Sequence, residues 1–418
     1  MSFEVYKFGG ASVATADGVR NLVEVLKATG KQDLVIVVSA MGKMTNAFER
    51  VIGAYFESTD LVSETLQPII EYHFELSSNL FENPSAPVFK KLQSFFDELK
   101  GFLNRNKSPD YNFVYDQVIA YGELLSTTIV NAYLKEQGFD SKWHDIRDFI
   151  KTDASYREGK VNWDVTMRNL SRNLPKSGIQ LTQGFIASET NGFTTTLGRE
   201  GSDYTAAIIA YCLNAERVTI WKDVPGVLSA DPRYFENAEL LHFISYQEAI
   251  ELAFYGASVI HPKTLQPLQR KEIPLYVKSF IDYKAPGTQV SLGKAIDPEV
   301  PCYILKTGQV LLELASLDFS FMAEENIGEI FKLLGTYKMK VDLIQNSAIS
   351  FSVCVDNKYK NLEALVAKLR ADFKVTVHQD VFLYTLRHAT DETVRLLELN
   401  KEILLKQVTQ NTVQLVTV

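Results

Sequence analysis

The stretch from Thr194 to Ala207 has residue types and spacing that suit the binding of a small anion. Gly198 and Gly201 permit backbone angles that a Cβ atom forbids, and they leave room for a ligand close to the chain. Arg199 lies between them, and its guanidinium can hold a carboxylate or a phosphate by two parallel hydrogen bonds. A Gly-x-x-Gly turn alone is more often an ordinary connection, so the prediction depends on partners elsewhere in the chain.

The same stretch runs into an apolar helical pattern that starts near Ala206. Ser202 and Asp203 stand before this pattern, and both residue types are favoured as helix caps. The free N–H groups and the dipole at a helix start attract anions. We therefore expect Ser202 and Asp203 to cap a helix whose N-terminus contributes to the anion site.

A lysine precedes a pair of glycines at the end of the first predicted strand. The run from Val5 to Phe8 is strand-like, and Gly9 and Gly10 break it before a predicted helix. A lysine at the carboxyl end of a strand, beside glycine N–H groups, is suited to gripping phosphate oxygens. Lys7 is therefore a candidate phosphate ligand, and the alternative is a strand-end lysine beside a turn.

Polar residues follow two further strand-like runs. One run of β-branched residues ends before Ser39, with Thr45 a few residues later, and another run ends in Lys222 and Asp223. Ligands of open α/β sheets bind beyond the carboxyl ends of the strands, so these side chains are candidates for ligand contacts. For Ser39 and Thr45 the alternative role is to cap the helix that follows.

One candidate acid lies in a helical pattern. Glu123 falls in the early turns of a helix predicted over residues 118–127. Its carboxylate can meet a substrate ammonium group, and the alternative is that it only stabilises the helix N-terminus. The six histidines and the three distant cysteines have no metal-ligand spacing, so the sequence predicts no metal site.

Strands alternate with helices from the N-terminus to about residue 290. This order predicts an α/β domain with a mostly parallel layered sheet. Proline and glycine residues between positions 284 and 301 mark a domain boundary. Beyond it, a strand-helix-strand-strand unit occurs twice, beginning at Val310 and at Phe382. We therefore expect an α/β domain over residues 1–290 and tandem ferredoxin-like modules over residues 301–418.

The composition excludes several classes of protein. The chain is 46% hydrophobic and 22% charged, which is normal for a soluble globular protein. A net charge of -8 argues against a general nucleic-acid surface. No apolar run approaches the ~20 residues of a membrane span, and the N-terminus lacks the pattern of a signal peptide. We therefore expect a cytoplasmic protein that binds neither nucleic acid nor membrane.

Six motifs, taken in order, resemble those of the aspartate kinases. They are Lys7-Phe-Gly-Gly, Ser39-Ala-Met-Gly, Gln183-Gly-Phe-Ile, the stretch from Thr194 to Ala207, Trp221-Lys-Asp-Val-Pro-Gly and Gly256-Ala-Ser-Val-Ile-His-Pro. Each motif is weak alone, but their order and spacing are specific, and the resemblance covers essentially the whole chain. The repeat after residue 301 resembles the tandem ACT domains that follow the kinase domain in that family.

The resemblance implies transfer of the ATP γ-phosphoryl group to the side-chain carboxylate of L-aspartate, with Mg²⁺ carried by the nucleotide. This reaction is the first step toward lysine, threonine and methionine. An aspartate side chain with a pKa of about 3.9 is already ionised at neutral pH, so the reaction needs no general base. The resemblance also implies an inhibitory amino acid, lysine or threonine, and a homodimer or larger homo-oligomer formed through the ACT modules.

The resemblance also implies a role for each candidate residue. Lys7 stabilises charge, with Asp203 organising the centre. Glu123 meets the ammonium of aspartate and Arg199 its α-carboxylate. The remaining implied contacts are Ser39, Thr45 and Ser202 for aspartate; Lys7, Gly9, Gly10, Lys222, Asp223, Arg233 and Ser258 for the nucleotide; and Val341, Asp342 and Ser347 for the effector.

Ser258 departs from the family pattern, which usually has a lysine facing the nucleotide at this position. Lys222 and Lys263 are the nearby lysines able to supply the missing charge, and we favour Lys222 because it ends a sheet strand. The alternative is that both are solvated and Mg²⁺ suffices. In the first ACT unit, Ala323-Glu-Glu-Asn replaces a glycine-bearing turn, so the inhibitor does not follow from the resemblance.

Two other functions remain open on the sequence. The first is a non-catalytic amino-acid sensor whose kinase fold has lost its donor chemistry. Ser258 favours this alternative, whereas Lys7, Arg199, Asp203 and Asp223 count against it. The second is a related kinase that acts on glutamate or on another carboxylate or phosphate acceptor.

Overall fold

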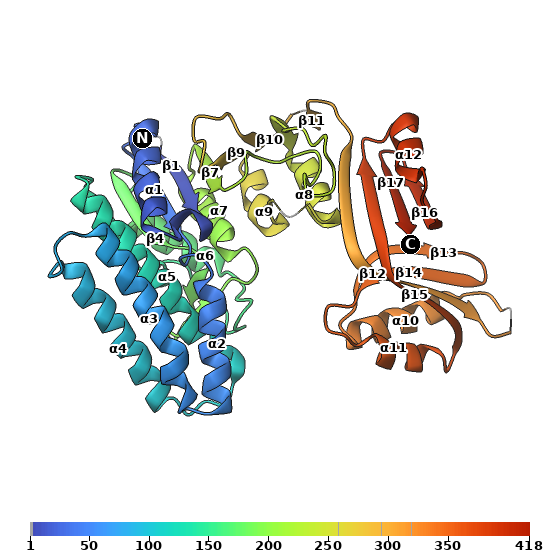
Figure 1. Cartoon of the computed structure of the whole chain (residues 1–418), viewed down its shortest axis with the longest axis horizontal. Helices are drawn as coiled ribbons and strands as arrows, with labels where there is room; N and C mark the ends of the chain where they lie inside the picture. Colours follow the sequence, from blue (N-terminus) through green and yellow to red (C-terminus); the bar gives the residue numbers. More distant parts are fainter. Residues whose placement is uncertain (1–2, 258, 294, 319) are drawn as a thin grey trace. The chain divides into compact units, whose positions relative to one another are not determined.

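The computed structural model describes residues 3–257, 259–293, 295–318 and 320–418. Its internal contacts divide the chain into two compact units (Figure 1). The first unit contains Met1–Val227, Leu240–Ile250 and Val259–Asp297, and the second contains Leu228–Glu239, Glu251–Ser258 and Pro298–Val418.

A nine-stranded sheet forms the centre of the first unit. Its strands are β1 (Glu4–Phe8), β2 (Leu34–Val38), β3 (Ser141–His144), β4 (Ile179–Gln183), β7 (Arg217–Lys222), β8 (Phe243–Ser245), β9 (Leu275–Ser279), β10 (Thr288–Ser291) and β11 (Ile296–Asp297). Their order is β11-β8-β10-β9-β7-β1-β2-β4-β3. The neighbours from β9 to β3 all run parallel, so their carboxyl ends lie along one edge. A separate hairpin contains β5 (Ile186–Ser188) and β6 (Thr194–Thr196).

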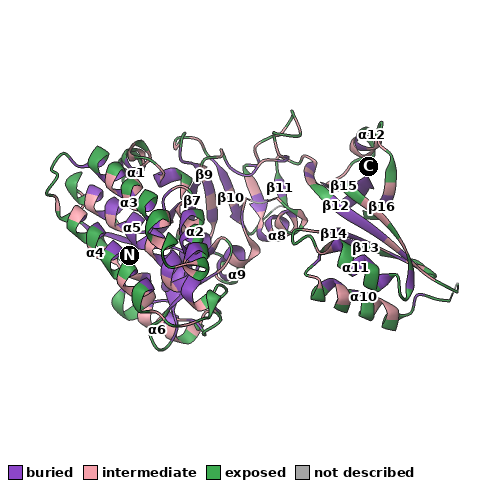
Figure 2. Ribbon diagram, turned by 60° about the horizontal axis from the view of Figure 1, so that its bottom comes forward, coloured by how far each residue is buried: buried purple, intermediate pink, exposed green. Residues whose placement is uncertain are grey.

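The sheet is buried on both faces. Every residue of β1, β2 and β4 is buried, and the β-branched run of β2 is typical of a covered parallel strand. Figure 2 shows the sheet mainly in purple and the outer faces of α1, α3 and α4 in green. The helices of this unit are α1 (Ala16–Thr29), α2 (Met44–Glu57), α3 (Leu61–Leu80), α4 (Pro87–Arg105), α5 (Tyr111–Glu136), α6 (Trp163–Asn173), α7 (Gly201–Leu213) and α9 (Pro262–Arg270).

Local sequence sets the ends of these helices. Thr15 caps α1 by accepting a hydrogen bond from the N–H group of Gly18, and Gly30 ends this helix in a left-handed conformation with a φ of 63°. α8 (Tyr246–Tyr255) begins in the first unit and ends in the second. Within the described residues, no helix is both long enough and apolar enough to cross a membrane.

The second unit is built on a six-stranded antiparallel sheet with the order β13-β14-β12-β15-β17-β16. The strands are β12 (Cys302–Ser316), β13 (Lys340–Asn346), β14 (Ser350–Asp356), β15 (Phe373–Arg387), β16 (Ile403–Thr409) and β17 (Thr412–Thr417). The helices are α10 (Glu324–Thr336), α11 (Leu362–Leu369) and α12 (Asp391–Glu398). Leu334 of α10 and Leu365 of α11 pack into one core with Val353 of β14.

Two long strands belong to both halves of this sheet. β12 and β15 have 15 residues each. The second part of β12 pairs with β14 and with the first part of β15, whereas residues 302–306 pair with residues 383–387 of β15. The C-terminal module, which ends at a strand, is therefore completed by a segment that precedes the first module. The predicted fold, a mostly parallel layered sheet followed by tandem ferredoxin-like modules, is confirmed.

Candidate active site

Three charged side chains meet at the carboxyl edge of the parallel sheet. Lys7 Nζ, from β1, lies 2.6 Å from Oδ1 of Asp203, and Lys222 Nζ, from β7, lies 3.5 Å from Oδ2. Burial opposes ionisation of the Asp203 carboxyl, but the positive charges of the two lysines outweigh it and lower its pKa. Asp203 therefore remains a carboxylate that holds two ammonium groups in place.

The expected capping role of Ser202 and Asp203 is wrong. The N-cap of α7 is Glu200, which has a left-handed φ of 53°, and no side chain caps this helix. Ser202 and Asp203 lie inside the first turn, where the ion pairs with lysines take up the Asp203 carboxylate. Ser202 packs closely against Gly184, since its Cβ would lie 2.4 Å from a Cβ added to that glycine.

The glycine turn after β1 contacts the turn after β2. A Cβ on Gly10 would lie 2.7 Å from the carbonyl oxygen of Ala40, and the N–H group of Gly42 donates to the Gly10 carbonyl over 2.9 Å. The Lys7 ammonium lies 3.5 Å from the position of a Cβ on Gly9. Lys7, Gly9 and Gly10 thus lie together at the carboxyl edge of the sheet. The glycines leave room for a phosphate group to approach the backbone there.

Glu123 lies in the middle of α5 rather than in the early turns of a helix, so its expected position and the alternative dipole role are wrong. The helix starts at Tyr111 because Asp110 caps it, accepting hydrogen bonds from the N–H groups of Asn112 and Phe113. Glu123 is buried, with 3% of its surface exposed. Burial raises its pKa to about 8, against the opposing hydrogen bonds from the backbone N–H groups of Glu123 and Ala40.

One oxygen of this buried carboxyl group, Oε2, has no hydrogen-bond partner among the described residues. The group lies beside the turn after β2, since Ser126, on the same helix, donates to the Ser39 carbonyl over 2.7 Å. A buried carboxylate with an unused oxygen is costly unless a ligand supplies a donor. A ligand ammonium is such a donor.

Ser39 and Thr45 also lie near this turn, and neither caps α2. The N-cap of α2 is Lys43, with no side-chain hydrogen bond, and Thr45 falls within the first turn. The alternative capping role for the two residues is therefore wrong. Both side chains are half-buried.

Arg199 lies in the loop before α7, between two residues with positive φ, Gly198 at 78° and Glu200 at 53°. Its side chain is exposed, and within the described parts of the chain no hydrogen bond or ion pair holds the guanidinium. Lys263 Nζ lies 3.6 Å from the position of a Cβ on Gly198. Arg199 of this loop and Lys263 of α9 are therefore two cationic side chains at one backbone segment with positive φ angles.

Asp116 holds the backbone near this loop by hydrogen bonds, and it was not among the residues predicted from the sequence. The carboxylate of Asp116 accepts hydrogen bonds from the N–H groups of Arg157 and Thr196, both at 2.9 Å, and from the Thr196 hydroxyl at 2.8 Å. Burial raises its pKa to about 6. Asp116 and Glu123 are seven residues apart on α5, a spacing that puts both acids on one helix face and was visible in the sequence.

Other candidate residues lie outside this group. Asp223 is exposed after β7. Arg233 belongs to the second unit, where its guanidinium pairs with Asp231. Ser258 lies outside the described residues. The candidate effector residues, Val341, Asp342 and Ser347, belong to the second unit.

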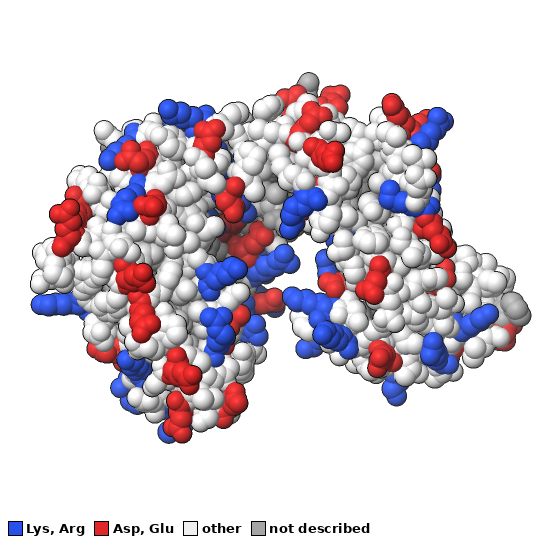
Figure 3. Space-filling view, in the orientation of Figure 1, with Lys and Arg blue, Asp and Glu red and all other residues white. Residues whose placement is uncertain are grey.

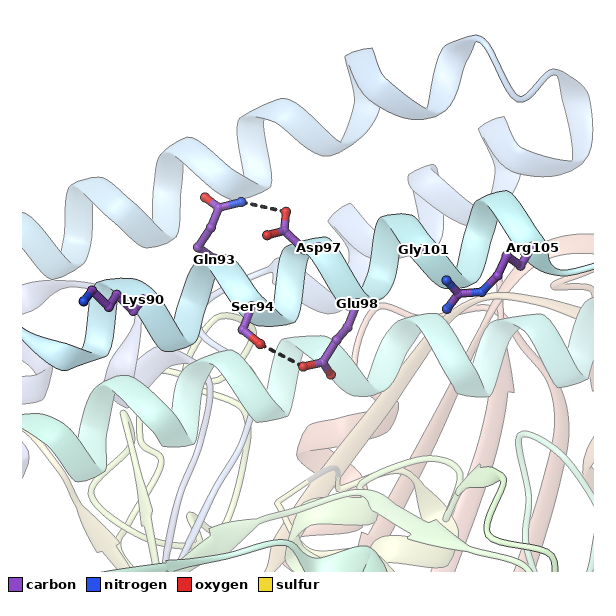
Figure 4. Close-up of a pocket in the computed structure, with 7 residues that line it drawn as sticks. All are labelled: Lys90, Gln93, Ser94, Asp97, Glu98, Gly101 and Arg105. Carbon is purple, nitrogen blue, oxygen red and sulfur yellow. Dashed lines mark hydrogen bonds between the residues drawn. The ribbon is translucent and has the colours of Figure 1, made fainter.

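The described surface includes charged side chains of both signs and a hollow on α4. Charged side chains of both signs are mixed over the face in Figure 3. The hollow in Figure 4 is lined only by residues of α4. There Gln93 donates to Asp97 over 2.8 Å and Ser94 to Glu98 over 2.9 Å, so the polar groups satisfy one another as on an ordinary solvated helix.

Residues 2–279 match the amino acid kinase family, the class of protein that this fold and this edge define. The chain is 31% identical over 399 residues to lysine-sensitive aspartokinase 3 of Escherichia coli strain K12, covering 91% of this chain and 86% of that protein. The chain therefore belongs to the aspartokinases of the amino acid kinase family.

Two solved structures of E. coli aspartokinase III resemble the whole chain. The complex with lysine and aspartate, in the T-state, has a TM-score of 0.84 at 28% identity and covers 99% of this chain and 95% of that one. The complex with aspartate and ADP, in the R-state, has a TM-score of 0.82 at 28% identity and covers 99% and 96%. The chain spans 42% of a bifunctional aspartokinase/homoserine dehydrogenase of Arabidopsis thaliana, with 30% identity over 390 residues.

Proposed function

We propose that this chain transfers the γ-phosphoryl group of ATP to the side-chain carboxylate of L-aspartate. A carboxylate oxygen forms a bond to the γ-phosphorus, and the bond from that phosphorus to the bridging oxygen breaks. The electron pair leaves with ADP, and the product is 4-phospho-L-aspartate. No proton has to be removed, since the acceptor is already ionised at neutral pH.

The observation that carries this proposal is the placement of Asp203 between Lys7 and Lys222 at the carboxyl edge. The reaction brings two anions together, so its barrier falls when fixed positive groups stabilise the developing charge. Lys7 is fixed by its buried ion pair and lies over the glycine turn, which suits it to this role.

The acceptor side uses Glu123 and Arg199. The unused oxygen of Glu123 receives the ammonium of aspartate, and the guanidinium of Arg199 holds the α-carboxylate by two hydrogen bonds. Ser39, Thr45 and Ser202 complete the pocket. Two contacts at the α-carbon orient the side-chain carboxylate toward the phosphate, which favours reaction by proximity.

Mg²⁺ would be carried by the nucleotide, and it would supply neutralisation of the phosphate charge. It prefers oxygen ligands and keeps several of its waters, so it needs few protein groups. Because Asp203 is occupied by two lysines, the exposed carboxylate of Asp223 is the available oxygen donor after β7. Asp223, Gly9 and Gly10 belong to the nucleotide side, and we assign Arg233 to the same side.

The chain is organised, on this proposal, as a kinase domain over residues 1–290 and a regulatory ACT pair over residues 301–418, acting in the cytoplasm as a homo-oligomer. Inhibition by lysine or threonine acts through the second unit, near Val341, Asp342 and Ser347. The structure with lysine bound to a relative supports an amino-acid effector. Asp342 pairs with Lys306 at 2.8 Å, so an effector ammonium has to compete with this internal one.

The aspartokinase relatives do not favour a non-catalytic sensor or a kinase for another acceptor. A coupled assay of ADP release with L-aspartate, with L-glutamate and without acceptor distinguishes the three functions. We expect release with aspartate, and trapping by hydroxylamine should give the hydroxamate expected from an acyl phosphate. Equal release with glutamate, or none with either acid, would contradict the proposal.

Lys7→Ala provides the matched test of the mechanism. Loss of a preorganised positive group should lower kcat by ~10²–10⁴ with folding intact, as judged by circular dichroism. Near-normal turnover of the folded variant would remove Lys7 from the mechanism.

A further inference from the structure

One carboxylate of the candidate active site holds two ammonium groups. Lys7 Nζ lies 2.6 Å from Oδ1 of Asp203, and Lys222 Nζ lies 3.5 Å from Oδ2. A single carboxylate balances one positive charge, so the three groups together carry one excess positive charge. The neighbouring Asp223 is exposed and makes no ion pair with Lys222 in the described part of the chain. The excess charge is therefore available to a bound anion.

The second ammonium is accessible from the sheet edge. The side chain of Lys222 is 21% exposed, against 9% for Lys7. Lys7 lies opposite Ile220 in the ladder between β1 and β7. Side chains two residues apart along a strand point to the same face, so Lys222 shares a face with Lys7 and lies nearer the edge. The Lys7 ammonium thus lies beside Gly9, and Lys222 lies nearer the carboxyl edge on the same face.

Backbone contacts fix Lys222 without burying it. Its Nζ also donates to the carbonyl oxygen of Val259 over 2.5 Å. Lys263 is the other lysine considered as a source of positive charge for the nucleotide. Its Nζ lies beside Gly198, which belongs to the same loop as Arg199. The geometry favours Lys222 over Lys263, because Lys222 is the one of the two that pairs with Asp203, the carboxylate that also holds Lys7.

We propose that Lys222 binds a phosphate group of the donor nucleotide together with Lys7, and that Asp203 positions both ammonium groups. This inference rests on the proposed kinase function but does not depend on the identity of the acceptor. Lys222 supplies the positive charge that the resemblance places at position 258, where this chain has a serine. Loss of a hydrogen bond between charged groups corresponds to about a 10- to 100-fold loss of affinity.

Direct binding of Mg²⁺-ADP to the full chain tests the proposal without any acceptor. Calorimetry should show a Kd about 10- to 100-fold higher for Lys222→Met than for the unchanged protein. Lys278→Met is the matched control. Lys278 lies opposite Trp221 in the neighbouring strand β9, with its ammonium 5.6 Å from the indole centroid, and it does not contact Asp203. We expect its Kd to stay within about twofold.

Circular dichroism establishes whether Lys222→Met is folded. If Lys222→Met does not fold, Lys222→Gln takes its place, because glutamine can still donate a hydrogen bond. The double variant Lys222→Thr with Ser258→Lys should recover most of the affinity that Lys222→Thr loses.

In kinetics, the KM for ATP should rise for Lys222→Met while the KM for the acceptor stays within about twofold. An unchanged Kd for ADP in the folded Lys222 variants, or an equal loss in Lys278→Met, overturns the proposal. Because ADP binding needs no acceptor, failure of the aspartate assay leaves this test intact.

Discussion

At the scale of single residues, burial decides the charge that Glu123 can carry. Its pKa of about 8 means that most of the carboxyl is protonated at pH 6 in the free protein. The proposed contact with a substrate ammonium needs the ionised form. We therefore predict that kcat/KM for aspartate rises between pH 6 and pH 8 and levels off above an apparent pKa near 8, since this ratio reports groups of the free enzyme.

The Glu123→Gln variant tests this assignment, because glutamine keeps the shape and cannot ionise. Its kcat/KM should be low and lack the rise near pH 8, which the rate profile from pH 5.5 to 9 would reveal. If the variant retains the same rise, another group controls the pH dependence.

The contact proposed for Arg199 is of a different kind, because it depends on the shape of the guanidinium as well as on its charge. Arg199→Lys keeps the positive charge and removes the two-pronged guanidinium. The KM for aspartate should therefore rise about tenfold or more, while the KM for ATP changes little. Initial-rate kinetics with each substrate varied in turn would measure both constants. A selective rise in the KM for ATP would assign Arg199 to the nucleotide instead.

The sequence indicated the residue types that meet at the candidate site, but not all of their local structural roles. Asp203 has the sequence position of a helix cap, yet α7 starts at Gly201, with Glu200 as its N-cap, and Asp203 pairs with lysines from two strands. Those strands are more than 200 residues apart in the chain and become neighbours only in the sheet. Propensity describes local structure, so it could not reveal a pairing that depends on strand order.

At the scale of elements, α3 contains a buried histidine that links stability to pH. Nδ1 of His73 lies 2.7 Å from the carbonyl oxygen of Ile69, so this nitrogen carries the proton and Nε2 is an acceptor. Nε2 is buried without a hydrogen-bond partner among the described residues. Protonation would place an unpaired charge beside Phe96, and burial lowers the pKa of His73 to about 4.

We predict that His73 destabilises the protein as the pH falls from about 6.5 to 4. In this range the unfolded chain binds a proton that the folded protein excludes, so unfolding becomes more favourable, by up to about 3 kcal/mol. His73→Leu removes this contribution and should flatten the pH dependence of the unfolding free energy, measured by urea denaturation at each pH. Parallel curves for the two proteins would show that His73 does not titrate as inferred.

Element boundaries were harder to predict than element types. The helix around Glu123 extends from Tyr111 to Glu136, well beyond residues 118–127, because Asp110 caps it and the apolar pattern continues around the whole helix. The sheet strands were clearer, since β2 is a short run of β-branched residues with no polar interruption.

At the scale of the whole molecule, the described residues of the second unit form three apolar clusters on shared strands. Val353 and Leu365 belong to the first module, whereas Leu397 and Leu415 belong to a separate cluster in the C-terminal module. β12 and β15 run through both modules. The repeat predicted two modules, but it could not show that they share strands, because the segment before Val310 has no counterpart in the repeated pattern.

Because β12 and β15 run through both modules, we predict that the two modules unfold as one cooperative unit. Leu415→Ala removes a fully buried side chain from the C-terminal module, and such a change typically costs 2–5 kcal/mol. Loss of β17 packing destabilises β15, and β15 also pairs with the part of β12 that supports β14. Hydrogen exchange should therefore become faster in β14 as well as in β17. Val408→Ala, at a side chain that is 61% exposed, is the control and should change neither strand. If Leu415→Ala accelerates exchange in β17 and leaves β14 protected, the modules unfold independently despite their common strands.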